Sequence, residues 1–155
     1  MLLSLVVWVG GLVFFPVVAQ TAFSVLPAPH LAGLMVRHAL IELHWMGIVS
    51  GTVFLFSSLA YEWLNAGSQR LWSVRNVLIV SMLALTLVSQ FEIIPRMERL
   101  RTSVPDFDSL PSNDPVRVSF SALHVWSTRL EAGVLLLGLI VVGIVSNLLP
   151  TSKSS

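Results

Sequence analysis

Four long apolar stretches run along the chain, separated by shorter polar segments. They predict four membrane-spanning helices over residues 2–26, 38–64, 72–101 and 115–149. Each stretch is long enough to cross the hydrocarbon core of a bilayer, which takes about 20 helical residues. The sequence therefore predicts an all-α fold, a single-domain membrane bundle of four helices over residues 1–155 with both termini on one side.

Prolines indicate how these helices begin and bend. Pro16 is expected to kink the first helix without ending it, because neighbouring helices in a membrane can satisfy the freed carbonyl. Asp114 followed by Pro115 is typical of an N-cap and a first helical residue. A helix from Pro115 to Leu149 would be roughly 52 Å long, against a hydrocarbon core of about 30 Å. We therefore expect helices three and four to extend beyond the bilayer at the loop-rich face, defined as the side that carries residues 27–37 and 102–114.

Composition supports a membrane protein. Hydrophobic residues make up 55% of the chain and charged residues 11%, whereas soluble domains carry about 25% charged residues. The net charge of +1 gives no basic surface for a nucleic acid, so no nucleic-acid partner is expected. The chain has no cysteine, which excludes disulfides and thiolate metal sites.

The distribution of basic residues predicts an orientation. The loop-rich face would carry Arg37, Arg96, Arg99, Arg101 and Arg117, and the opposite face Arg70, Arg75 and Lys153. Because cytoplasmic loops are enriched in Lys and Arg, the loop-rich face is expected in the cytoplasm, with the protein in a bacterial-type inner (plasma) membrane.

Glycine spacing predicts close contacts between helices. Gly47 and Gly51 form a GxxxG pattern, which lets helices approach closely in lipid, and Gly10 with Gly11 could do the same on the first helix. The alternative is chance occurrence in an apolar segment. The tryptophans near predicted helix ends are interpreted as interface anchors. They are Trp8, Trp45, Trp63, Trp72 and Trp126.

Ionisable and polar residues gather where three of the predicted helices meet the loop-rich face. The candidate site residues are Glu42, His44, Gln90, Glu92, Arg96, Arg99, His124, Arg129 and Glu131. On the last helix Arg117, His124 and Glu131 recur every seven residues and form a polar stripe. Charged residues in a membrane cost about 2.5 to 3.5 kcal/mol each, so they usually face the bundle interior and pair. The cluster is therefore either a ligand or proton site, or a structural latch in which arginines neutralise Glu42, Glu92 and Glu131.

The chain also resembles domain of unknown function 4149, the transmembrane protein 205-like family. The residues that carry the resemblance are Trp8, Gly10, Gly11, Phe15, Pro16, Phe23, His44, the run Ser89-Gln90-Phe91, the run Pro95-Arg96-Met97-Glu98, Arg101, Phe120, His124, Ser127 and Arg129. The resemblance implies a multi-pass membrane protein of four helices and no particular activity. Glu131 stands where an asparagine-like residue would be expected.

Three functional classes follow from these observations. The first is an accessory or structural membrane subunit that presents its protruding helix ends to a membrane protein partner or a second copy. The second is a small transporter or resistance factor that binds a cation or relays protons. The third is a haem or metal protein that uses His44 and His124, although no cofactor is predicted from the residues alone. No nucleophile motif, HExxH or phosphate-binding loop is present, so the chain is not expected to be an enzyme.

Overall fold

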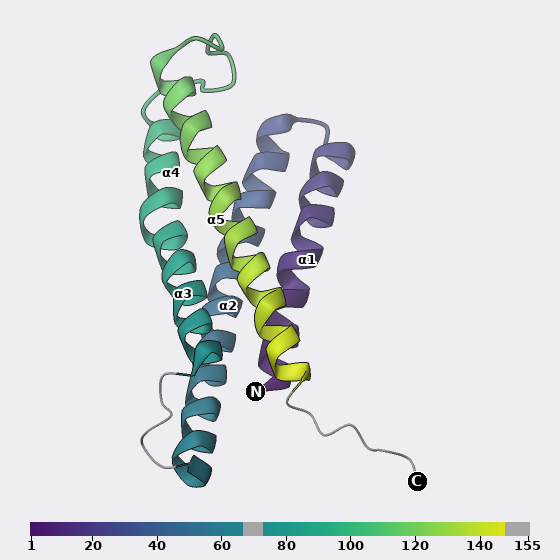
Figure 1. Ribbon diagram of the computed structural model, residues 1–155. Helices are drawn as coiled ribbons and strands as arrows, with labels where there is room; N and C mark the ends of the chain where they lie inside the picture. The colour runs from purple at the N-terminus through teal and green to yellow at the C-terminus, as the bar shows by residue number, and fades with distance from the viewer. Residues whose placement is uncertain (67–72, 148–155) are drawn as a thin grey trace.

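The fold is an up-and-down bundle of helices. The computed structural model describes residues 1–66 and 73–147. Its elements are α1 (Leu2–Val25), α2 (Pro29–Ala66), α3 (Val74–Val88), the π-helical turn η2 (Ser89–Ile93), α4 (Ile94–Thr102) and α5 (Pro115–Ser146). Elements α3, η2 and α4 form one continuous crossing, so the described residues contain four helical crossings long and apolar enough to span a membrane. Figure 1 shows the chain start and the end of α5 at the same end of the bundle.

The predicted fold class is confirmed, and the largest difference from the predicted helix bounds is at the start of α2. Helix α2 begins at Pro29, earlier than the predicted residue 38. Pro29 is the first residue of α2, a position to which proline is well suited. The proline-rich segment before α2 is therefore only a short connection. Helix α1 continues through Pro16 to Val25. Residues 148–149 of the predicted last helix lie outside the described residues.

The start of α5 has the predicted cap. The Asp114 carboxylate accepts a hydrogen bond from the backbone N–H of Val116 at 2.8 Å, and Pro115 is the first helical residue. This bond satisfies one of the N–H groups that the first turn of a helix leaves without an intrahelical partner.

Helices α1 and α2 meet at the GxxxG pattern. The Trp8 ring lies over Gly47 and Gly51: a methyl group on Gly51 would come within 2.5 Å of Trp8 Cζ3, and one on Gly47 within 2.8 Å of Trp8 Cε2. Trp8 is therefore a core residue, 1% exposed, and its interpretation as an interface anchor is wrong. Gly11 contacts α2 as well, whereas Gly10 has no atom within 4 Å of its Cβ position, so the predicted packing role does not hold there.

The other tryptophans are placed differently. Trp45, Trp63 and Trp126 are exposed on the outside of the bundle, and Trp72 lies outside the described residues. Many further large apolar side chains are exposed along all four crossings. An outside of this kind fits contact with lipid, because exposed apolar surface of that extent is rare on soluble monomers.

The helices end at different levels at each end of the bundle. Figure 1 shows the start of α5 and the segment that joins it to α4 extending past the turn between α1 and α2 at the loop-rich face. At the opposite face α2 continues well past the start of α1, which was not predicted. The contact of Trp8 with Gly51 explains this, because the residues of α2 beyond about Phe54 have no part of α1 beside them.

Candidate functional site

The centre of the candidate site is the imidazole of His44 on α2, which bridges two other crossings. Its Nδ1 lies 2.8 Å from Gln90 Oε1 on η2, and its Nε2 lies 2.5 Å from Glu131 Oε1 on α5. The His44 side chain is 1% exposed and that of Glu131 is 16% exposed. Three candidates that lie far apart in the sequence therefore form one hydrogen-bonded chain inside the bundle.

The π-helical turn η2 positions Gln90. Its wider backbone turn is closed by the N–H of Ile94, which donates to the carbonyl of Ser89 five residues earlier. Pro95 follows at once and has no N–H to donate, so an interrupted hydrogen-bond ladder is expected here. Single π-helical turns inside α-helices occur frequently at functional sites. Ser89 is fully buried, and its hydroxyl has no hydrogen-bond partner among the described residues.

The His44 site lies at the level of the middle of α1. Gly11 of α1 faces Leu43 and Met46 of α2, so His44 lies at the depth of Gly11, near the middle of α1. Helix α1 carries no charged side chain, and its length of roughly 36 Å is close to the thickness of the hydrocarbon core.

The geometry requires a proton between His44 and Glu131. Gln90 Oε1 can only accept, so the hydrogen on His44 Nδ1 points to it. His44 Nε2 and the Glu131 carboxylate would then both be acceptors at 2.5 Å unless one of them carries a proton. The proton is either on Nε2, giving an imidazolium and carboxylate, or on the carboxyl, giving a neutral pair.

The remaining candidates do not join this chain of hydrogen bonds. Glu42 and His124 are exposed, and the exposed Arg129 guanidinium lies 5.4 Å from the centre of the Trp126 ring. Glu92 and Arg96 form an ion pair of 2.7 Å on the outside of their own crossing, with side chains 56% and 57% exposed. Of the predicted latch, in which arginines neutralise Glu42, Glu92 and Glu131, the Glu92–Arg96 pair is present, at the surface of the bundle. Glu131 has the histidine His44 as its partner instead of an arginine.

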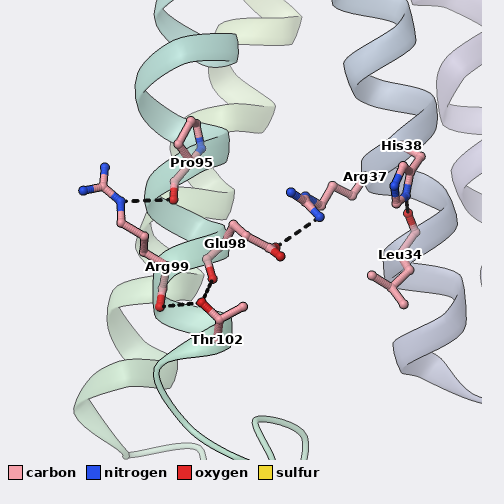
Figure 2. A network of polar contacts seen from close by, with 7 residues as sticks. All are labelled: Leu34, Arg37, His38, Pro95, Glu98, Arg99 and Thr102. Atoms are coloured by element: carbon pink, nitrogen blue, oxygen red, sulfur yellow. Dashed lines mark hydrogen bonds and ion pairs between the residues drawn. The ribbon is translucent and has the colours of Figure 1, made fainter.

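The basic end of α4 contacts α2 in one place. Arg37 of α2 lies 3.3 Å from Glu98, as Figure 2 shows. The Arg99 side chain points to the other side of α4, and its Nε donates to the backbone carbonyl of Pro95 at 3.4 Å. Arg96, Arg99 and Leu100 of α4 line an open hollow together with Leu123 of α5.

His44 and His124 do not form a pair of ligands. His124 is exposed on α5 two turns before Glu131, roughly 10 Å along the helix, while both ring nitrogens of His44 are already hydrogen-bonded. In residues 1–66 and 73–147 no group of three or more His, Asp or Glu side chains could hold a metal ion.

A second buried polar network, near the far end of α2, was missed by the sequence analysis. Arg75 lies 2.8 Å from Glu62 and donates from Nε to the Ser58 hydroxyl at 3.0 Å. The Ser58 hydroxyl donates to Asn76 at 2.7 Å, and the Asn76 amide donates to the second Glu62 oxygen at 3.1 Å. These bonds join α2 to the start of α3. The available signal was the spacing of Ser58 and Glu62, which places both on one face of a helix.

Taken together, the apolar outside, the four crossings and the buried polar groups define a multi-pass integral membrane protein with a four-helix bundle. Its interior carries ionisable side chains that are buried between the crossings.

The chain belongs to the family described as domain of unknown function (DUF4149), which matches residues 3–104. The match includes His44 and Gln90 and ends before α5, so Glu131 lies outside it. No curated protein matches the chain, and no solved structure matches it.

Proposed function

We propose that this protein relays protons in the membrane, with the His44–Glu131 pair as its proton-binding site. The observation that supports this most directly is a fully buried imidazole, hydrogen-bonded through both nitrogens, that lies 2.5 Å from a carboxylate at the level of the middle of α1. Ionisable residues at such depth commonly mark proton relays and ion pathways.

The relay step is the loss and regain of one proton. Release from the loaded pair leaves the Nε2 lone pair facing the Glu131 carboxylate, a repulsive contact that water or a separation of the two side chains must relieve. Gln90 Oε1 keeps the other hydrogen on Nδ1 throughout, so Nε2 is the atom that gains and loses the proton. Because His44 and Glu131 lie on different helices, loading the pair also strengthens the contact between α2 and α5.

The polar stripe on α5 indicates the face of the bundle from which protons reach the pair. Ser127 and His124 precede Glu131 by four and seven residues, so they lie above it on one side of the helix toward the loop-rich face. Ser127 is buried and His124 is exposed, which makes His124 the member that meets water or headgroups. We propose that protons reach Glu131 from the loop-rich face, which the arginine distribution favours as the cytoplasmic side.

The surroundings of the pair favour Glu131 and His44 as the titrating groups. Helix α1 contains no ionisable side chain, and Glu42 and Glu92, on α2 and η2, are exposed. The alternative of an accessory or structural subunit assigns the pair only to holding α5 in place. The two functions differ in whether the proton exchanges in the folded protein.

Proton exchange can be measured directly on the protein in lipid nanodiscs. Infrared difference spectra recorded between about pH 5 and pH 8, the range over which histidine usually changes charge, should contain a carboxyl band and an imidazole band. Both bands should disappear in Glu131→Gln and His44→Gln, while His30→Gln, which changes an exposed histidine at the start of α2, should leave them intact.

A flux measurement tests the relay itself. Vesicles that contain the protein and a pH-sensitive dye should lose an imposed pH gradient faster than empty vesicles, and Glu131→Gln should abolish the difference. His124→Gln should slow the loss without abolishing the infrared bands. Wild-type vesicles that hold the gradient as well as empty ones, with no pH-dependent bands, would leave the pair as a structural contact only.

A further inference from the structure

We propose that the hollow between α4 and α5 at the loop-rich face binds the headgroup of an anionic phospholipid. Four side chains line it: Arg96, Arg99 and Leu100 from α4, and Leu123 from α5. Two guanidinium groups beside two leucines match the two parts of a phospholipid, a phosphate diester and the apolar chains attached to it. This inference is independent of the proton site.

The depth of the arginines fits the phosphate layer. Gln90 lies at the level of His44 near the middle of α1, and Arg99 follows it by nine residues along one crossing. At about 1.5 Å per residue, and with the middle of α1 at the bilayer midplane, this places Arg99 roughly 13 Å from the midplane, against a half-thickness of about 15 Å for the hydrocarbon core. The Arg99 side chain is long enough to reach the phosphates from there.

The charge of the hollow fits a ligand with one negative charge. Arg96 is paired with Glu92 at 2.7 Å, while Arg99 donates a hydrogen bond to the neutral backbone carbonyl of Pro95. The side chains of Glu92, Arg96 and Arg99 together carry one net positive charge. Figure 2 shows the Arg99 guanidinium on the side of α4 that faces away from Glu98 and α2, so the Arg37–Glu98 ion pair does not compete for it.

The guanidinium group suits this ligand, because its planar set of donors binds two phosphate oxygens at once. Leu100 and Leu123 come from two different helices and provide an apolar wall beside it. Basic pockets between membrane helices are a recurrent way of binding anionic lipid headgroups. A lipid bound here would join α4 to α5 at the end of the bundle where their connecting segment begins.

The test compares three ligands on the purified protein in a neutral detergent. Phosphatidylglycerol, phosphatidylcholine and inorganic phosphate are titrated separately, and binding is followed by native mass spectrometry and by the shift in Tm. We expect phosphatidylglycerol to bind and to raise the Tm, with phosphatidylcholine and inorganic phosphate at least about tenfold weaker. Inorganic phosphate that binds as well as phosphatidylglycerol would show a site for a free anion and overturn the lipid assignment.

Variants locate the site. Arg99→Gln should weaken phosphatidylglycerol binding about fivefold, the contribution typical of one basic residue near a membrane surface. Arg96→Gln should weaken it more, because Glu92 is then left without its partner. Arg129→Gln is the matched control, since it removes an exposed arginine of α5 that does not line the hollow. Equal losses in Arg99→Gln and Arg129→Gln, or no loss in either, would overturn the proposal.

Discussion

The ion pair between Glu62 and Arg75 should be among the strongest single interactions in the bundle. The two side chains are 5% and 11% exposed, and Glu62 also accepts a hydrogen bond from Asn76. Removing one partner, as in Glu62→Gln or Arg75→Gln, leaves the other charge buried and uncompensated. Such a loss costs about 3 to 5 kcal/mol of unfolding free energy.

A double-mutant cycle separates this cost from the loss of each side chain by itself. The double variant Glu62→Gln/Arg75→Gln should cost clearly less than the sum of the two single changes, because no unpaired charge remains. The matched control is the pair Glu92–Arg96, which is more than half exposed and is expected to couple by only about 0.3 to 0.5 kcal/mol. Unfolding free energies in mixed detergent micelles supply all the values.

Single changes at Glu62 and Arg75 with small and strictly additive effects would contradict a buried ion pair at this position. So would a coupling energy at Glu62–Arg75 no larger than that at Glu92–Arg96. Either result would mean that water reaches the far end of α2 and screens the pair.

Two further predictions concern packing and topology. Gly51→Ala should lower the Tm, because the added methyl group meets Trp8 and Leu83, at a cost of about 1 to 3 kcal/mol. Gly10→Ala should leave the Tm unchanged or raise it, because its Cβ position is open and alanine favours a helix. A Tm lowered equally in both variants would exclude the tight contact at Gly51. Because the chain has no cysteine, Ser109→Cys and Ser155→Cys can be labelled one at a time with a membrane-impermeant reagent in intact cells and in inverted vesicles, and they should react from opposite sides. Labelling of both from one side would contradict four crossings.

The sequence was sufficient for the fold class because length and apolarity decide whether a helix crosses a bilayer. It also placed His44, Gln90 and Glu131 in one cluster, since antiparallel crossings bring their positions to a similar level. It could not show that Glu92 and His124 point out of the bundle while these three point into it, because the direction of a side chain depends on the rotation of its helix. The π-helical turn also changes the direction of the side chains that follow Ser89 in this crossing. Arg75 was interpreted only as a topological signal, because nothing local shows that Glu62 lies beside it.

The π-helical turn at Ser89–Ile93 has a consequence for comparing relatives of this protein. A turn of this kind holds one residue more than an ordinary α-helical turn of the same height. A family member that keeps a regular α-helix here should therefore be one residue shorter in this crossing, and its alignment with this chain needs a gap of one residue between positions 89 and 93. Without that gap, every position from Ile94 to Thr102 would be equated with a neighbour that faces a different direction.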